Sequence, residues 1–174
     1  EIMRSDWSSD VCSSDLLGII EPSRGKVKFK NKNNEEINPD FSKIGYIPQE
    51  PNLFPGTIKQ NITMFDNELN SKVKRAIEEV KLDSDIKKFK NGANTELDLN
   101  KLNISGGQRQ KIVLARAKIH GSKIILIDEG TSAIDQKATF NILKNLLQSE
   151  ATIVFIAHNF NENIRNLFDR EIKL

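Results

Sequence analysis

Two runs of consecutive apolar residues, each followed by ionisable residues, constrain the fold of this chain most. Ile124–Ile127 is apolar throughout and is followed directly by Asp128 and Glu129, and Thr152–Ala157, apolar after its first residue, is a second run that ends at His158. Short, continuously apolar runs are typical of strands buried on both faces of a parallel sheet. Ligands of such sheets bind at the carboxyl ends of the strands. The sequence therefore predicts a binding site at this edge.

The remaining segments alternate between the two-residue period of strands and the 3.6-residue period of helices, which indicates an α/β fold with a parallel core. Between about Thr57 and Lys118 the expected strands are too few for that sheet, so we expect a separate helical lobe there. We expect further strands at Gly25–Lys30, Lys43–Ile47 and Arg170–Leu174, and helices at Thr57–Phe65, Ser71–Lys81, Ser84–Lys90, Ser105–His120, Phe140–Leu147 and Asn163–Phe168.

Composition and charge exclude several classes of protein. The chain has 174 residues, the usual length of one domain. Its 26 Lys and Arg residues are interleaved with 24 Asp and Glu residues, so no nucleic-acid partner is expected. No apolar run approaches the roughly 18 residues of a membrane span. Any link to a membrane is expected to come through a partner or another part of the protein.

A second candidate binding segment is Ser105-Gly106-Gly107-Gln108, at the start of the longest expected helix. Ser105 is a good N-cap residue, and Gly121 is a good helix stop. A serine hydroxyl and glycine N–H groups at a helix start favour an anion such as phosphate, because the helix dipole places partial positive charge there. A plain N-cap with flexible glycines is the alternative interpretation.

Four segments, in this order, resemble the ATP-binding domain of ABC transporters. They are YIPQEPNLF (Tyr46–Phe54), ISGGQRQKIVLARA (Ile104–Ala117), IILIDEGTSAID (Ile124–Asp135) and IVFIAH (Ile153–His158). They are similar to the Q-loop, the signature helix, the Walker B strand with its D-loop, and the strand before the switch histidine. Ile104 stands where Leu is usual, and Gly130 where Ala or Pro is usual. The stretch from Leu53 to Ile62 resembles exporter-type domains.

The resemblance covers about residues 17–174. It implies a P-loop NTPase-like parallel sheet core with a helical signature lobe, truncated at both ends. It also implies catalytic roles: Asp128 would serve Mg²⁺, Glu129 would be the general base, His158 would contact the γ-phosphate, and Gln49 would contact Mg²⁺ and the attacking water.

Further roles implied by the resemblance lie across a dimer. Ser105, Gly106, Gly107 and Gln108 would bind ATP held by a second ABC ATPase domain, and Asp135 of the D-loop would communicate between the two. Homodimer and heterodimer are equally open. Transmembrane transporter domains would be the other partners, fused or separate, so that the chain would act at the cytoplasmic face of the cell membrane.

Residues 1–16 do not fit this pattern. The family carries a phosphate-binding Walker A loop, G-x-x-G-x-G-K-[ST], before a Leu-rich helix, whereas no Lys precedes Lys26 and no Gly precedes Gly18. Asp6–Leu16, DWSSDVCSSDL, resembles one reading frame of a sequencing-library adapter. We therefore expect residues 1–16 to be non-native or disordered and residues 17–174 to be a partial ABC ATPase domain. On that expectation, the chain as it stands binds ATP weakly.

The expected function is to power an ABC transporter, most simply an exporter, by ATP hydrolysis. One alternative is a degenerate domain that regulates without hydrolysis, and the intact SGGQ, Glu129 and His158 argue against it. Another is an ABC ATPase outside transport, such as a translation factor or a chromosome-maintenance ATPase. Tandem domains or a long coiled coil would favour that alternative, but the interval from Gln49 to Ser105 reads as a compact lobe.

Overall fold

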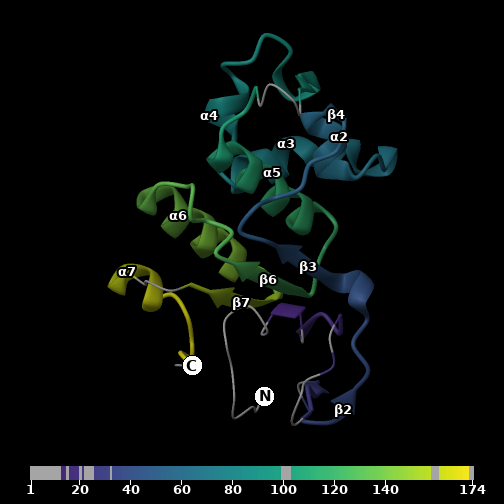
Figure 1. Ribbon diagram of the computed structural model, residues 1–174, viewed down its shortest axis with the longest axis vertical. Helices are drawn as coiled ribbons and strands as arrows, with labels where there is room; N and C mark the ends of the chain where they lie inside the picture. Colours follow the sequence, from purple (N-terminus) through teal and green to yellow (C-terminus); the bar gives the residue numbers. More distant parts are fainter. Residues whose placement is uncertain are drawn as a thin grey trace.

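A three-stranded parallel sheet forms the centre of the computed structural model (Figure 1). Its strands are β3 (Ile44–Ile47), β6 (Ile124–Asp128) and β7 (Thr152–Ile156), in the order β3-β6-β7. Ile124 lies between Ile44 and Thr152 in the register. The predicted parallel α/β core is therefore confirmed. The structure describes residues 13–14, 16–19, 21, 26–31, 33–98, 103–157 and 161–172.

The middle strand, β6, is buried on both faces, as its apolar run predicts. Ile125 and Ile127 are at most 1% exposed and belong to the main hydrophobic cluster, whereas Leu126 points to the other face and packs with Leu16. This alternation follows from the two-residue period of a strand. A strand covered on both sides fixes the position of whatever follows it in sequence.

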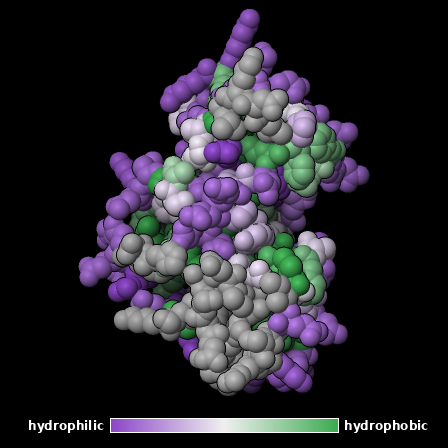
Figure 2. All heavy atoms as spheres, in the orientation of Figure 1, coloured by the Kyte–Doolittle hydropathy of each residue, from purple (hydrophilic) through white to green (hydrophobic). Residues whose placement is uncertain are grey.

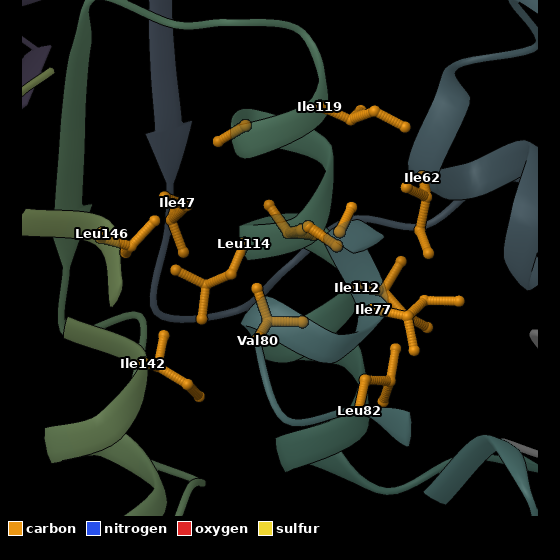
Figure 3. Close-up of a cluster of buried hydrophobic side chains, with 14 of the residues drawn as sticks. Ile47, Ile62, Ile77, Val80, Leu82, Ile112, Leu114, Ile119, Ile142 and Leu146 are labelled. Carbon is orange, nitrogen blue, oxygen red and sulfur yellow. The ribbon is translucent and has the colours of Figure 1, made fainter. Parts of the chain in front are cut away.

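Helix α5 (Gly106–Ile119) connects the sheet to a group of shorter helices. It contacts β3 as well as α2 (Ile58–Thr63) and α3 (Val73–Glu79). Figure 3 shows side chains from these elements and from α6 meeting in one buried cluster. The sheet and the helices therefore share one hydrophobic core. The helix group also contains the 3-10 helix η2 (Asn67–Lys72) and the short α4 (Asp83–Ile86).

Both expected ends of α5 are confirmed. Ser105 caps its first turn, and Gly121 adopts a left-handed φ of 65° directly after the last turn. Helix α6 (Gln136–Leu147) begins earlier than the expected Phe140, because Asp135 accepts a hydrogen bond from the Ala138 amide and caps the helix there. Helix α7 (Glu162–Arg165) is shorter than expected.

The structure also contains two short antiparallel pairs, and of their strands only residues 29–30 lie within an expected strand, Gly25–Lys30. They join β1 (Phe29–Lys30) to β2 (Glu36–Ile37), and β4 (Gly56–Thr57) to β5 (Glu96–Leu97). Two-residue strands are too short to show a periodicity. The strand expected from Arg170 is wrong for residues 170–172, which pair with no strand in the described part of the chain.

The face drawn in Figure 2 is largely hydrophilic, with separate hydrophobic spots. Exposed large apolar side chains near α2 are Phe54, Met64 and Phe65, each 40–51% exposed. Within the described ranges, no helix has the length and apolar character needed to cross a bilayer.

Candidate functional site

The carboxyl edge of the sheet brings together two polar residues that are 80 positions apart. Gln49 follows β3, and Glu129 follows β6, its neighbour in the sheet. Because the two strands are parallel, their carboxyl ends meet at one edge. The side-chain Nε2 of Gln49 donates a hydrogen bond to Oε2 of Glu129 at 2.7 Å. The structure thus places two of the predicted site residues in direct contact.

The backbone of Glu129 is in the left-handed region, with φ at 49°. Non-glycine residues rarely adopt this conformation, which costs about 1–3 kcal/mol and persists only where surrounding contacts enforce it. Here the Glu129 N–H donates to the carbonyl of Ile156 at 3.0 Å, and its own carbonyl accepts from the Ser132 N–H at 2.9 Å. The site therefore holds this acid in a strained, fixed orientation, which the sequence did not predict.

Asp128 lies beside two hydroxyl groups. Its Oδ2 accepts hydrogen bonds from Ser13 Oγ at 2.8 Å and from the Tyr46 hydroxyl at 3.4 Å. Burial raises the pKa of Tyr46, and the Asp128 carboxylate adds to this effect, while the hydrogen bond with Ser13 opposes it. Tyr46 therefore stays a protonated donor at neutral pH. Neither hydroxyl has a signal in the sequence that marks it as part of the site.

A hollow of about 330 Å³ adjoins Glu129. Polar side chains of Ser132, Gln136 and Asn161 line it together with apolar residues. His158, predicted to act at this edge, lies outside the described residues. Among those that are described, no three His, Cys, Asp or Glu side chains cluster closely enough to hold a metal by themselves.

The start of α5 is organised by reciprocal capping. The Ser105 N–H donates to Oε1 of Gln108 at 2.8 Å, and the Gln108 N–H donates to Oγ of Ser105 at 3.2 Å. The side chain of Gln108 also donates to Oδ1 of Asp85 at 3.2 Å. The Gln108 amide is therefore occupied within its own chain, whereas the Ser105 hydroxyl, which accepts at the cap, keeps a proton to donate.

Asp85 anchors this helix start from α4. Its Oδ2 accepts from Lys111 Nζ at 2.9 Å, and both side chains are largely buried, at 16% and 13% exposed. Burial alone would raise the pKa of Asp85, but the hydrogen bonds from Lys111 and Gln108, together with the charges of Lys111 and Lys88, lower it by more. The pKa of Asp85 therefore lies below its usual value, and the carboxylate stays charged.

The segment that follows Gln49 is fixed at its far end by the fully buried Asn61. Its Oδ1 accepts from the Phe54 N–H at 2.8 Å, and its Nδ2 donates to the Phe54 carbonyl at 2.9 Å. Arg116 of α5 donates to the Asn61 carbonyl at 2.8 Å, and its guanidinium lies 5.3 Å from the centre of the Phe54 ring. Helix α5 therefore helps to set the position of this loop.

A further residue with a part in the site was missed: Gln110 of α5. Its side chain is 1% exposed and hydrogen-bonds to both Gln49 and the turn after Glu129. A signal was present, because Gln110 stands three, four and seven positions before Val113, Leu114 and Ala117, on the apolar face of the helix. A polar side chain on such a face needs buried hydrogen-bond partners.

Comparison with known proteins agrees with this geometry. A solved structure described as a bacterial Atm1-family ABC exporter with ATP bound superposes with a TM-score of 0.73 and 25% sequence identity, over 86% of this chain and 27% of that one. The fold is thus of the P-loop NTPase-like α/β class. The family described as ABC transporter matches residues 14–132, and the chain belongs to this family.

Curated relatives include bacterial proteins named as transport/processing ATP-binding proteins. The lactococcin transport/processing ATP-binding protein LcnC-like of Lactococcus lactis is 35% identical over 82% of this chain and 21% of its own length. The mesentericin-Y105 transport/processing ATP-binding protein MesD of Leuconostoc mesenteroides is 37% identical over 82% of this chain and 20% of its own length. The chain is similar to the ATP-binding domain of exporters, and it spans about a fifth of the length of these relatives.

Proposed function

We propose that the chain is the ATP-binding and ATP-hydrolysing domain of an ABC exporter. The observation that carries this proposal is the 2.7 Å contact between Gln49 and Glu129 at the carboxyl edge of the sheet, beside Asp128. A carboxylate and an amide side by side can orient a water and accept its proton. The names of the relatives, which are ATP-binding transport proteins, support the same role.

Glu129 is the proposed general base, and Gln49 orients the attacking water. The Asp128 carboxylate suits Mg²⁺, since this ion prefers oxygen ligands and usually binds one or two carboxylates plus substrate phosphates. Mg²⁺ held there would neutralise charge on the phosphates. Gln49 could contact the ion as well. His158 is proposed to contact the γ-phosphate.

The α5 start is proposed to act on ATP held by a second domain of the same family. The Ser105 hydroxyl and the first-turn N–H groups of Gly106 and Gly107 suit phosphate oxygens, because a helix start leaves those groups without intrahelical partners. The Gln108 side chain then supports the cap. Asp135 caps α6 and lies on the turn that would face the partner domain.

The assembly requires other partners. We propose that two such domains, alike or different, pair with transmembrane transporter domains at the cytoplasmic face of the membrane. Residues 1–16 remain proposed to stand in place of the phosphate loop, so this 174-residue chain is expected to bind ATP more weakly than the protein read from the intact gene. A loop of backbone amides and a Lys normally holds the β- and γ-phosphates.

The test is ATP hydrolysis by the protein encoded by the whole gene, compared with Glu129→Gln and Gln49→Ala. A general base contributes about 10²–10⁴-fold to a rate, so Glu129→Gln is expected to lower kcat by that factor with ATP still bound. Glu50→Gln, on an exposed neighbour of Gln49, is the control and should keep its activity. Full hydrolysis by Glu129→Gln, or none by the unaltered protein, would overturn the proposal.

A further inference from the structure

The buried side chain of Gln110 connects three segments of the site. Its Nε2 donates to the carbonyl oxygen of Gln49 and to Oγ of Ser132, both at 3.2 Å, and its Oε1 accepts from the Ala133 N–H at 3.0 Å. Both amide hydrogens and the amide oxygen are therefore in use. With 1% of its surface exposed, the side chain has no access to bulk water as an alternative partner.

These bonds complete a closed circuit around Glu129. Gln110 holds the backbone of Gln49, whose side chain contacts Glu129 at 2.7 Å. The carbonyl of Glu129 accepts from the Ser132 N–H at 2.9 Å, and the Ser132 hydroxyl accepts from Gln110. The circuit includes the left-handed residue Glu129, a conformation that only surrounding contacts can maintain.

We propose that Gln110 is a positioning residue for ATP hydrolysis, which sets the distance between Gln49 and Glu129 and fixes the turn that follows. This proposal rests on the function proposed above. Gln110 acts through its neighbours and does not touch ATP. Gln110 lies on α5, whose first turn is the proposed phosphate contact. It therefore couples the position of that helix to the orientation of the proposed general base, Glu129.

The chemistry of the amide explains why this position carries Gln. A Met of similar shape would satisfy none of the three partners, and buried polar groups without partners are disfavoured. A Glu would offer only acceptors, so a carboxylate would face the carbonyl of Gln49. Gln110→Met and Gln110→Glu both keep the approximate volume of the side chain. Both remove the amide N–H donors, and Glu puts a charged acceptor in their place.

The experiment measures kcat and KM for ATP in the protein read from the whole gene. Gln110→Met and Gln110→Glu are expected to lower kcat by roughly 10- to 100-fold with KM changed by no more than about twofold, because a displacement near 1 Å at reacting groups can cost 10²-fold. Asn145→Ala is the matched control: it removes a part-buried hydrogen bond of 2.7 Å to the Glu79 carbonyl, far from this circuit. Equal kcat in the Gln110 variants and the control would overturn the proposal.

Ser132→Ala provides a second test in case the variants of the buried Gln110 fail to fold. Ser132 is exposed, and the change removes one bond of the circuit without altering the core. It should lower kcat by about 2- to 10-fold, the factor that one hydrogen bond supplies. Unchanged kcat in Ser132→Ala, together with a folded but fully active Gln110→Met, would exclude the positioning role.

Two further measurements separate positioning from a general structural effect. In Gln49→Ala, adding Gln110→Met should lower kcat by a smaller factor than it does in the unaltered protein, because part of its effect passes through Gln49 and part through the turn at Ser132; losses that multiply in full would contradict the proposal. Hydrogen exchange of the Ala133 amide should quicken in Gln110→Met, since Ala133 is exposed and Gln110 accepts its N–H. This exchange needs no ATP. If the unaltered protein fails to hydrolyse ATP, the proposed function falls, while unchanged Ala133 exchange would overturn the circuit itself.

Discussion

Gly107 lies directly against the backbone of Ala133: a Cβ built at Gly107 would come 2.6 Å from the Ala133 carbonyl oxygen. The adjacent Gly106 is in a different situation, because its Cβ would meet side chains alone: the Ala133 methyl group at 3.3 Å and the end of Arg109 at 3.9 Å. Backbone cannot move aside as a side chain can. The first turn of α5 and the turn after Glu129 therefore touch through a glycine that has no room for a side chain.

We expect Gly107→Ala to lower the free energy of unfolding by about 1–3 kcal/mol, as overpacking does. Gly106→Ala should stay within about 1 kcal/mol of the unaltered chain, since Ala gains helix propensity at its small steric cost. Urea unfolding of the two variants, followed by circular dichroism, makes the comparison. Equal midpoints for both variants would show that the close approach is not rigid.

Replacement of Asn61 tests the loop after Gln49. Asn61→Leu keeps the shape but leaves the N–H and carbonyl of Phe54 without their partner, which should cost about 2–3 kcal/mol of stability. Asn70→Leu is the control, because Asn70 is exposed and its side chain bonds only to Asn67, at 3.3 Å, in the described contacts; it should change stability by less than about 0.5 kcal/mol. A thermal unfolding series that ranks the two variants in the opposite order would contradict this account.

The ion pair of Asp85 and Lys111 predicts a pH dependence of stability. Because the pKa of Asp85 is lowered in the folded state, its contribution is fully present above the unfolded value of about 3.9 and is lost as pH falls through the folded value. Asp85→Asn should lower the free energy of unfolding by about 1.5–3 kcal/mol at pH 7, and by less near pH 3.

The control for this pair is Asp83→Asn. Asp83 meets Lys87 at 3.9 Å in an exposed pair, and such pairs contribute about 0–1 kcal/mol. Denaturant unfolding at pH 7, 5 and 3 distinguishes the contributions of the Asp85 and Asp83 carboxylates to the free energy of unfolding. A loss for Asp85→Asn that is the same at every pH would mean that its charge is not what stabilises the folded state.

The sequence predicts the sheet and α5 because their signals are long. The apolar run before Asp128 and the serine cap with its stop at Gly121 each involve several residues that agree. It predicts a strand that includes β1 but neither its partner β2 nor the pair β4–β5, because two-residue strands show no periodicity and Gly56 pairs with the distant Leu97. The adjacency of Gln49 and Glu129 follows once β3 and β6 are neighbours, which the sequence alone does not fix.

Other features of the site have no signal in one sequence. Nothing in the composition around Glu129 indicates a positive φ, since that conformation is imposed by partners from β7 and the following turn. Gly130 departs from the residues usual in the family, and the structure gives a reason: a Cβ there would meet the Ile47 side chain at 2.4 Å and its carbonyl oxygen at 2.9 Å. The predicted role of His158 stays a prediction.

The pairing of β3 with β6 also has a consequence for how the chain folds. Ile44 and Ile124 are partners in the sheet, yet the helices α2 to α5 lie between them in sequence. Closing such a long segment as an unstructured loop costs entropy, while contacts within the helices are local and form faster. We therefore expect the sheet edge that carries Glu129 to assemble late, after the intervening helices have shortened the distance that the chain must span.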